Sequence, residues 1–140
     1  MERRSGDGPV TAILKLAKPT AAPGEEIELM VELKIAPTWE ILALDASPNL
    51  AATRLALSLP PGVVANGHWN APPAAKSHTP DGHPVYIGNV IFTRSLTVQA
   101  ATQPGPVEIG CDVTFQACNA GLCLQPNVIE LKSTLPIKSP

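Results

Sequence analysis

The stretch Val107-Glu108-Ile109-Gly110-Cys111-Asp112-Val113-Thr114-Phe115-Gln116-Ala117-Cys118-Asn119-Ala120-Gly121-Leu122-Cys123 decides how this chain is expected to fold. Apolar side chains occupy alternate positions from 107 to 115, and this period of two is typical of a strand with one buried face. The stretch then reaches Cys118 and Cys123, which lie on either side of four residues. A connection of that length folds one strand back on the next and predicts an antiparallel hairpin.

The two cysteines of this hairpin are expected to face each other. Directly opposed Cα atoms in an antiparallel ladder lie about 4.5–5.5 Å apart, and a disulfide needs about 4.4–6.8 Å. So short a ring stabilises a fold by only about 2 kcal/mol. This small gain favours a bond that serves thiol exchange, although the geometry also permits a purely structural staple.

Cys111 is expected to play a different part. It lies seven residues before Cys118, and an odd separation puts two residues on opposite faces of a regular strand. It shares its face with Ile109 and Val113, which predicts a small buried hydrophobe. A third redox thiol is the alternative, and it would need a bulge in the strand.

The same pattern continues along the chain. Sixteen prolines and ten glycines divide the chain into runs that are too short to form helices. Strands are predicted at 10–16, 27–35, 39–44, 55–59, 63–69, 86–92, 96–98, 107–115 and 128–135. Short strands with turns at near-regular spacing predict an all-β fold, an immunoglobulin-like antiparallel β-sandwich.

Composition fits one such domain. The 140 residues are 44% hydrophobic and 16% charged, with a net charge of −2, so a real core is expected. We expect a flexible segment at 1–9, the domain at 10–136, and a tail or linker at 137–140. Scattered basic residues give no sign of nucleic-acid binding, and no apolar run is long enough to span a membrane. The N-terminus lacks the apolar stretch of a signal peptide, which indicates a cytoplasmic protein or a mature or excised piece.

Two further features leave alternatives open. The connection from Asn70 to Pro84 is long, polar and rich in proline, so it is either a functional lid or a surface excursion. If that loop folds over the hairpin, His83 could join Cys118 and Cys123 as a copper or zinc site, although two hairpin cysteines lack the ligands of a closed site. An immunoglobulin-like binding or structural module with an incidental disulfide is the main rival to a redox role.

The stretch Val113–Pro126 resembles the active-site hairpin of the N-terminal domain of the thiol–disulfide interchange protein DsbD family. The shared pattern is Val-Thr-aromatic-Gln-x-Cys, a short turn, a second cysteine and a proline soon after. Tyr86–Phe92, followed by Leu96-Thr97-Val98, is similar to the strand after that family's cap loop. Pro60-Pro61-Gly62 with Trp69 is similar to its Pro-Gly turn followed by a tryptophan.

This resemblance implies a fold, a place and a reaction. The domain would be an immunoglobulin-like sandwich in the periplasm or its equivalent, the outer module of a larger protein, and would act as a protein-disulfide reductase without a cofactor. Electrons would pass from a thioredoxin-like domain to this one and then to oxidised extracytoplasmic proteins. Cys123 would form the mixed disulfide and Cys118 would resolve it. The cap that shields the disulfide would correspond to His83, Val85 and Tyr86, in place of the family's acidic residues and phenylalanine.

Overall fold

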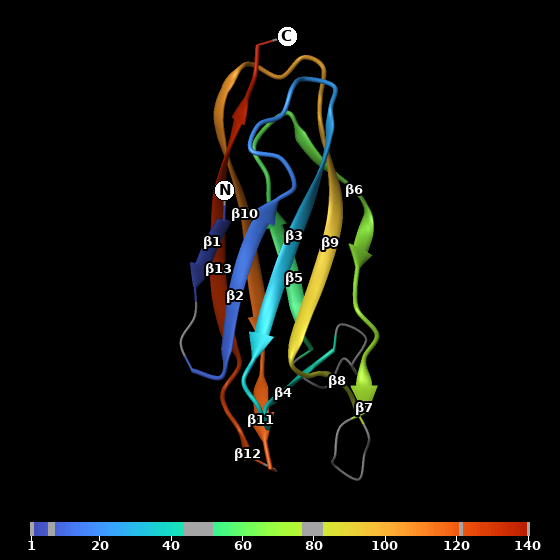
Figure 1. Cartoon of the computed structure of the whole chain (residues 1–140), viewed down its shortest axis with the longest axis vertical. Coiled ribbons are helices and arrows are strands. Elements are labelled where there is room, and N and C mark those ends of the chain that lie inside the picture. The colour runs from blue at the N-terminus through green and yellow to red at the C-terminus, as the bar shows by residue number, and fades with distance from the viewer. Residues whose placement is uncertain (1, 6–7, 44–51, 77–82, 121, 140) are drawn as a thin grey trace.

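The computed structural model describes residues 2–5, 8–43, 52–76, 83–120 and 122–139, and within these ranges the chain forms strands and no helix (Figure 1). It follows that no described segment is a helix that could cross a membrane. The strands, in chain order, are β1 (Glu2–Ser5), β2 (Val10–Leu16), β3 (Glu26–Ile35), β4 (Glu40–Leu42), β5 (Arg54–Ser58), β6 (Val63–Asn70), β7 (Ala75–Lys76), β8 (Pro84–Tyr86), β9 (Asn89–Val98), β10 (Gly105–Phe115), β11 (Ala117–Asn119), β12 (Leu122–Cys123) and β13 (Asn127–Ile137).

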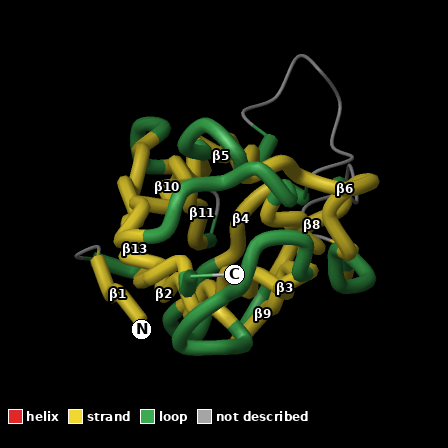
Figure 2. The backbone as a smooth tube through the Cα atoms, turned by 90° about the horizontal axis from the view of Figure 1, so that it is seen from above, coloured by secondary structure: helices red, strands yellow, loops and turns green. Residues whose placement is uncertain are grey.

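The strands form two layers. One layer is a five-stranded antiparallel sheet in the order β1-β2-β3-β9-β6. The other contains the sheet β13-β10-β5 and, where the chain runs on from β10 into β11, the sheet β12-β11-β4-β8-β7. Seen from above, β2, β3 and β9 lie on one side and β13, β10 and β5 on the other (Figure 2). The predicted immunoglobulin-like sandwich is therefore confirmed.

The core lies between these layers because each strand turns alternate side chains inward. In β3, Leu29, Val31 and Leu33 are fully buried, while Glu26 and Glu28, which precede them on the other face of the strand, are exposed. Burying one such side chain contributes about 1.5–3 kcal/mol. The largest fully buried side chains are Phe92, Leu14, Leu29, Leu33, Ile41, Leu96, Ile109, Leu131, Leu135, Val10, Val31 and Val85.

The strands differ from the predicted runs in one informative place. The run 86–92 is divided, because the chain leaves one layer after Tyr86 and enters the other at Asn89. Gly88 makes this change of layer with a φ of 67°, a left-handed conformation that glycine adopts at little cost. Beyond it, β9 is continuous through the residues predicted as two strands.

The ends of the chain also differ from expectation. Glu2–Ser5 pairs with β2 as strand β1, within the segment predicted to be flexible. At the other end β13 extends to Ile137, the first residue of the predicted tail. Part of the long connection 70–84, residues 77–82, lies outside the described residues, as does position 44 of the predicted strand 39–44.

Candidate redox site

The predicted cysteine hairpin is formed by β11 and β12 at the end of the molecule away from the C-terminus (Figure 1). Cys118 is paired with Cys123, and Asn119 with Leu122. The pairing of Asn119 with Leu122 makes the connection shorter than the four residues that the sequence suggested. Ala120 has a φ of 50°, the sign that two-residue hairpin turns favour at their central positions.

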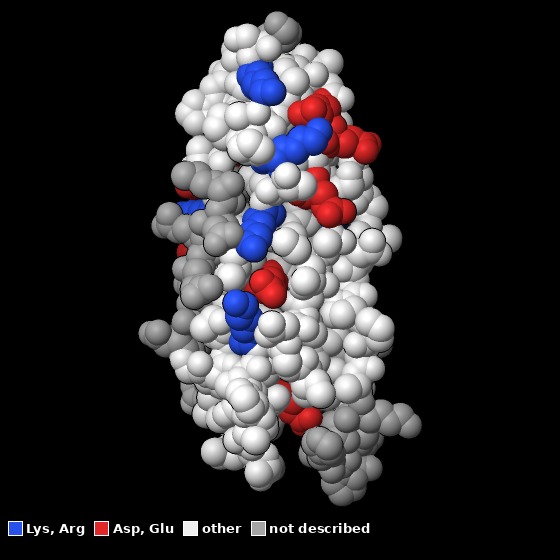
Figure 3. Space-filling model, viewed as in Figure 1, with Lys and Arg blue, Asp and Glu red and all other residues white. Residues whose placement is uncertain are grey.

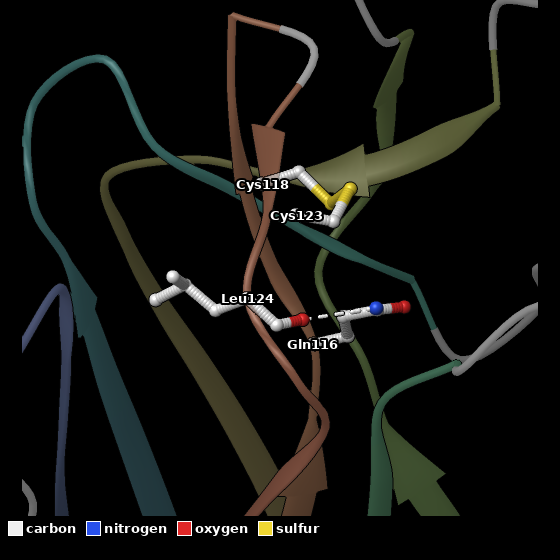
Figure 4. Close-up of a disulfide and its surroundings, with 4 residues drawn as sticks. All are labelled: Gln116, Cys118, Cys123 and Leu124. Carbon is white, nitrogen blue, oxygen red and sulfur yellow. Dashed lines mark hydrogen bonds between the residues drawn. A yellow bond between two sulfur atoms is a disulfide. The ribbon is translucent and has the colours of Figure 1, made fainter.

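The two cysteines form a disulfide (Figure 4). Their Cα atoms are 4.0 Å apart, closer than the expected window of about 4.5–5.5 Å. The prediction that they are opposed neighbours is confirmed. Cys123 is exposed and Cys118 is half-buried. β12 is the outer strand of its sheet, so Cys123 is the more accessible of the two cysteines.

Hydrogen bonds fasten both sides of the hairpin. The amide of Leu124 donates to the carbonyl of Ala117 at 2.9 Å, and Nε2 of Gln116 donates to the carbonyl of Leu124 at 3.0 Å (Figure 4). On the opposite edge of β11, Cys118 is paired with Glu40 of β4. The hairpin base therefore stays in place by contacts that do not depend on the disulfide.

The surroundings of the disulfide are nearly uncharged. The sequence has no charged residue between Asp112 and Glu130. On the face shown in Figure 3, charged side chains lie mostly away from the end where β11 and β12 meet. Glu40 is an exception: paired residues on neighbouring strands point to the same face, so its carboxylate shares the face of Cys118.

Apolar side chains are exposed at the same end of the molecule. Leu122 is 63% exposed, and Leu124, Val128 and Ile87 are 40%, 51% and 52% exposed. Ile87 also lines a hollow of about 310 Å³, together with residues 35–40 and 88. Exposed apolar residues gathered at one place are typical of a surface that contacts another protein.

Cys111 lies in the core, as the parity of the strand predicted. It is fully buried and carries a free thiol. Burial in apolar surroundings, with a smaller contribution from the charge of Asp112, raises the pKa of this thiol to about 12. The thiolate is the reactive form of cysteine, so burial and a raised pKa both disfavour reaction of Cys111 in the folded protein.

Labelling checks this assignment. The oxidised, folded protein is expected to take up no iodoacetamide at pH 8, and the unfolded, unreduced protein one equivalent, at Cys111. Because the pKa is raised from 9.0 to about 12 on folding, the unfolded chain loses this proton first. The contribution of the protonated Cys111 thiol to the free energy of unfolding is therefore complete below pH 9, and it is lost as the pH rises toward 12. Rapid labelling of the folded protein at Cys111 would show that it is accessible.

The proposed cap residues lie in and beside β8, on the far side of β4 from the hairpin. Val85 is paired with Leu42 and Tyr86 with Ile41. Since Leu42 and Glu40 alternate with Ile41, Val85 shares the face of the disulfide, while Tyr86 points into the core and contacts the ring of Phe92. His83, just before β8, is partly exposed. A shielding role for His83, Val85 and Tyr86 stays a prediction.

The alternative metal site does not assemble in this arrangement. The parts of the chain that the structure describes, which include His83 and both cysteines, contain no group of three or more histidine, cysteine, aspartate or glutamate side chains suited to hold a metal ion. The sulfurs of Cys118 and Cys123 are bonded to each other, whereas a metal is bound by thiolates.

Sequence reasoning did not find two neighbours of the hairpin. Glu40 and Thr38 lie about 80 residues before the hairpin in the sequence. Glu40 is paired with Cys118. Thr38 accepts a hydrogen bond at its Oγ1 from Nδ2 of Asn119, 3.2 Å long. The run 39–44 was predicted as a strand, but nothing in one sequence says which strand lies beside which. Gln116 did stand in the quoted motif, although without a role.

The fold and the site together define an immunoglobulin-like β-sandwich domain with an exposed hairpin disulfide at one end. Several solved structures share this fold, and two of them are N-terminal domains. The N-terminal periplasmic domain of ScsB from Proteus mirabilis matches with a TM-score of 0.58 and 13% identity, over 89% of this chain and 47% of that one. The N-terminal domain of Neisseria meningitidis DsbD in the reduced form matches with a TM-score of 0.50 and 16% identity, over 84% of this chain and 85% of that one.

These likenesses agree with the resemblance that the cysteine hairpin gave. The suspected similarity to the DsbD N-terminal domain is confirmed at the level of fold. This chain spans about half of the ScsB structure that it matches. No protein-family model matches the chain, and no curated protein sequence does.

Proposed function

We propose that this domain carries out thiol–disulfide exchange and passes reducing equivalents to other proteins through Cys118 and Cys123. The observation that carries the proposal is the disulfide itself, formed between an exposed and a half-buried cysteine on an outer hairpin. The fold shared with ScsB and DsbD domains supports it. A bond that closes so short a ring adds little stability, which favours an exchange role over a structural one.

The reaction has two halves. In the first, a thiolate of a reduced donor attacks the sulfur of Cys123, the Cys118–Cys123 bond breaks, and Cys118 takes up a proton. The donor's second thiol then displaces Cys123, so that the donor becomes a disulfide and the domain a dithiol. In the second half, the thiolate of Cys123 attacks an acceptor's disulfide, and Cys118 displaces the reduced acceptor. Two electrons pass in each half.

The environments of the two cysteines support these roles. Cys123 is exposed on the outer strand, where a partner's sulfur can reach it. Cys118 lies one strand closer to the carboxylate of Glu40. Cys123 is therefore the more accessible of the two sulfurs for a partner's disulfide. Attack on a partner therefore falls to Cys123, and resolution to Cys118.

The partners follow from the resemblance and from the surface. A thioredoxin-like domain would be the electron donor and oxidised extracytoplasmic proteins the acceptors. The uncharged, partly apolar end of the molecule suits proteins that dock by apolar contact. A periplasmic or other extracytoplasmic location is in keeping with a disulfide-bearing domain and with the periplasmic ScsB domain. Val85, which shares the face of the disulfide, and His83 just before β8 would restrict access by small thiols.

The test is electron transfer in two steps. Oxidised domain is mixed with one equivalent of a reduced thioredoxin-like protein, and the thiols are counted by alkylation and mass spectrometry. We expect Cys118 and Cys123 to gain one label each as the donor becomes oxidised. The reduced domain should then pass its electrons to an oxidised acceptor protein. A disulfide that the donor leaves intact would instead support a structural module with an incidental bond.

A further inference from the structure

The turn that precedes β4 has an unusual residue at its centre. The amide of Trp39 donates to the carbonyl of Ala36 at 3.1 Å, so residues 36–39 form a β-turn with Pro37 in its second position. Thr38 follows with a φ of 71°. This sign of φ in the third position is typical of a type II turn, where glycine is the usual residue.

Thr38 holds this conformation at a cost. Its branched Cβ makes a left-handed backbone unfavourable. Among the described residues other than glycine, positive φ values occur at Thr38 and Ala120 alone. Ala120 belongs to the turn of the redox hairpin. Both unfavourable backbones thus lie at the same end of the molecule as the disulfide.

The two turns are joined by one side-chain contact. Nδ2 of Asn119, the residue between Cys118 and Ala120, donates to Oγ1 of Thr38 at 3.2 Å. A glycine at position 38 would remove the backbone cost but also the hydroxyl group. The hydroxyl therefore gives a reason for threonine at a position that suits glycine.

We infer that Thr38 is a positioning residue of the redox pair, which it reaches through Asn119. When the disulfide is reduced, the covalent link between β11 and β12 is lost. What then keeps Cys118 in place is its pairing with β4 and the hydrogen bond between Asn119 and Thr38. By restricting Cys118, this hydrogen bond keeps the two thiols close and favours their reoxidation. The inference rests on the proposed exchange reaction, in which the pair cycles between both states.

The property that the hydrogen bond between Asn119 and Thr38 influences is the equilibrium constant for oxidation of Cys118 and Cys123. In glutathione buffer the domain's dithiol and one glutathione disulfide give the domain's disulfide and two glutathione thiols, a two-electron exchange in which both protons remain on sulfur. The hydrogen bond between Asn119 and Thr38 shifts this constant to the extent that it forms more fully in the closed, oxidised hairpin than in the reduced one. We therefore expect Asn119→Ala and Thr38→Ala to lower the oxidation constant about threefold, which corresponds to about 14 mV at 29.6 mV per tenfold.

Three further variants separate positioning from simple stability. Thr38→Ser keeps the hydroxyl group and should retain the wild-type constant. Thr38→Gly should lower the constant like Thr38→Ala while its oxidised form unfolds at the same or a higher temperature. Asn66→Ala is the matched control, because Asn66 makes hydrogen bonds of the same type to Ser95 and Thr97 in a different sheet. It should lower the unfolding temperature and leave the oxidation constant unchanged.

Three results would overturn the inference: unchanged constants for Asn119→Ala and Thr38→Ala, equal constants for Thr38→Ser and Thr38→Gly, or a shift in Asn66→Ala as large as that in Asn119→Ala. If the Cys118–Cys123 disulfide is too stable for glutathione to reduce, the oxidation constant is measured in dithiothreitol buffer instead. The same ratios between variant and wild-type constants are expected there. Neither reagent is a protein partner. A failure of electron transfer to proteins would therefore contradict the proposed function and leave these ratios as they are.

Discussion

Replacing Cys118 with alanine is expected to trap this domain in a mixed disulfide with its redox partners. Cys123 is exposed and can still attack a partner's disulfide, but without the thiol of Cys118 nothing on the domain displaces the partner. Turnover of electrons should fall to the level of the blank, while covalent adducts accumulate. Non-reducing gels and mass spectrometry of the adduct, with the linked peptide identified, measure both effects.

Two companion variants make this result specific. Cys123→Ala should form almost no adducts, because the remaining thiol is half-buried beside Glu40. Cys111→Ala should exchange as the wild type does, since that thiol is in the core. Adducts through Cys118 in the Cys123→Ala protein, with none in Cys118→Ala, would reverse the two roles. Adducts in neither would remove the case for exchange.

The Phe92→Ala substitution should cause the largest loss of stability, about 3–5 kcal/mol. Phe92 is fully buried in β9, and its ring meets that of Tyr86 edge to face, with centroids 5.4 Å apart. Removing it leaves a cavity between the layers and takes away the support of Tyr86, which is paired with Ile41 of β4. The free energy of unfolding in urea measures the loss.

A neighbouring residue provides the control. Ile91 lies one position earlier in β9 but is 45% exposed. Ile91→Ala should change the free energy of unfolding by only about 0.5 kcal/mol, as is usual for surface positions. Equal losses for the two variants would show that the alternation of buried and exposed positions in β9 does not describe the core.

The fold could be predicted because its main signals are local. Alternation in Ile27–Ile35 and in the stretch before Cys118 marks strands with one buried face, and β3 and β10 follow it closely. The parity of Cys111 needed only a regular strand between it and Cys118. The hairpin disulfide needed only a short turn between two cysteines. Each of these inferences concerns residues within about ten positions of one another.

The rest of the site depends on contacts that one sequence does not show. Glu40 lies beside Cys118, and Thr38 beside Asn119, because β4 pairs with β11 across about 80 residues of chain. The change of layer at Gly88 was hidden because the residues on both sides of it are apolar and β-forming. Glu2–Ser5 has no alternation of apolar and polar residues that would mark a strand. It is a strand because its backbone pairs with β2.

The most direct measurement of the central claim is the reduction potential of the Cys118–Cys123 pair. The purified domain is equilibrated in glutathione or dithiothreitol buffers of known poise, and the reduced fraction is read by acid quenching and alkylation. A bond that is made and broken in exchange should be half-reduced at a potential above about −300 mV. A midpoint well below about −300 mV, in the range of structural disulfides, would contradict the account.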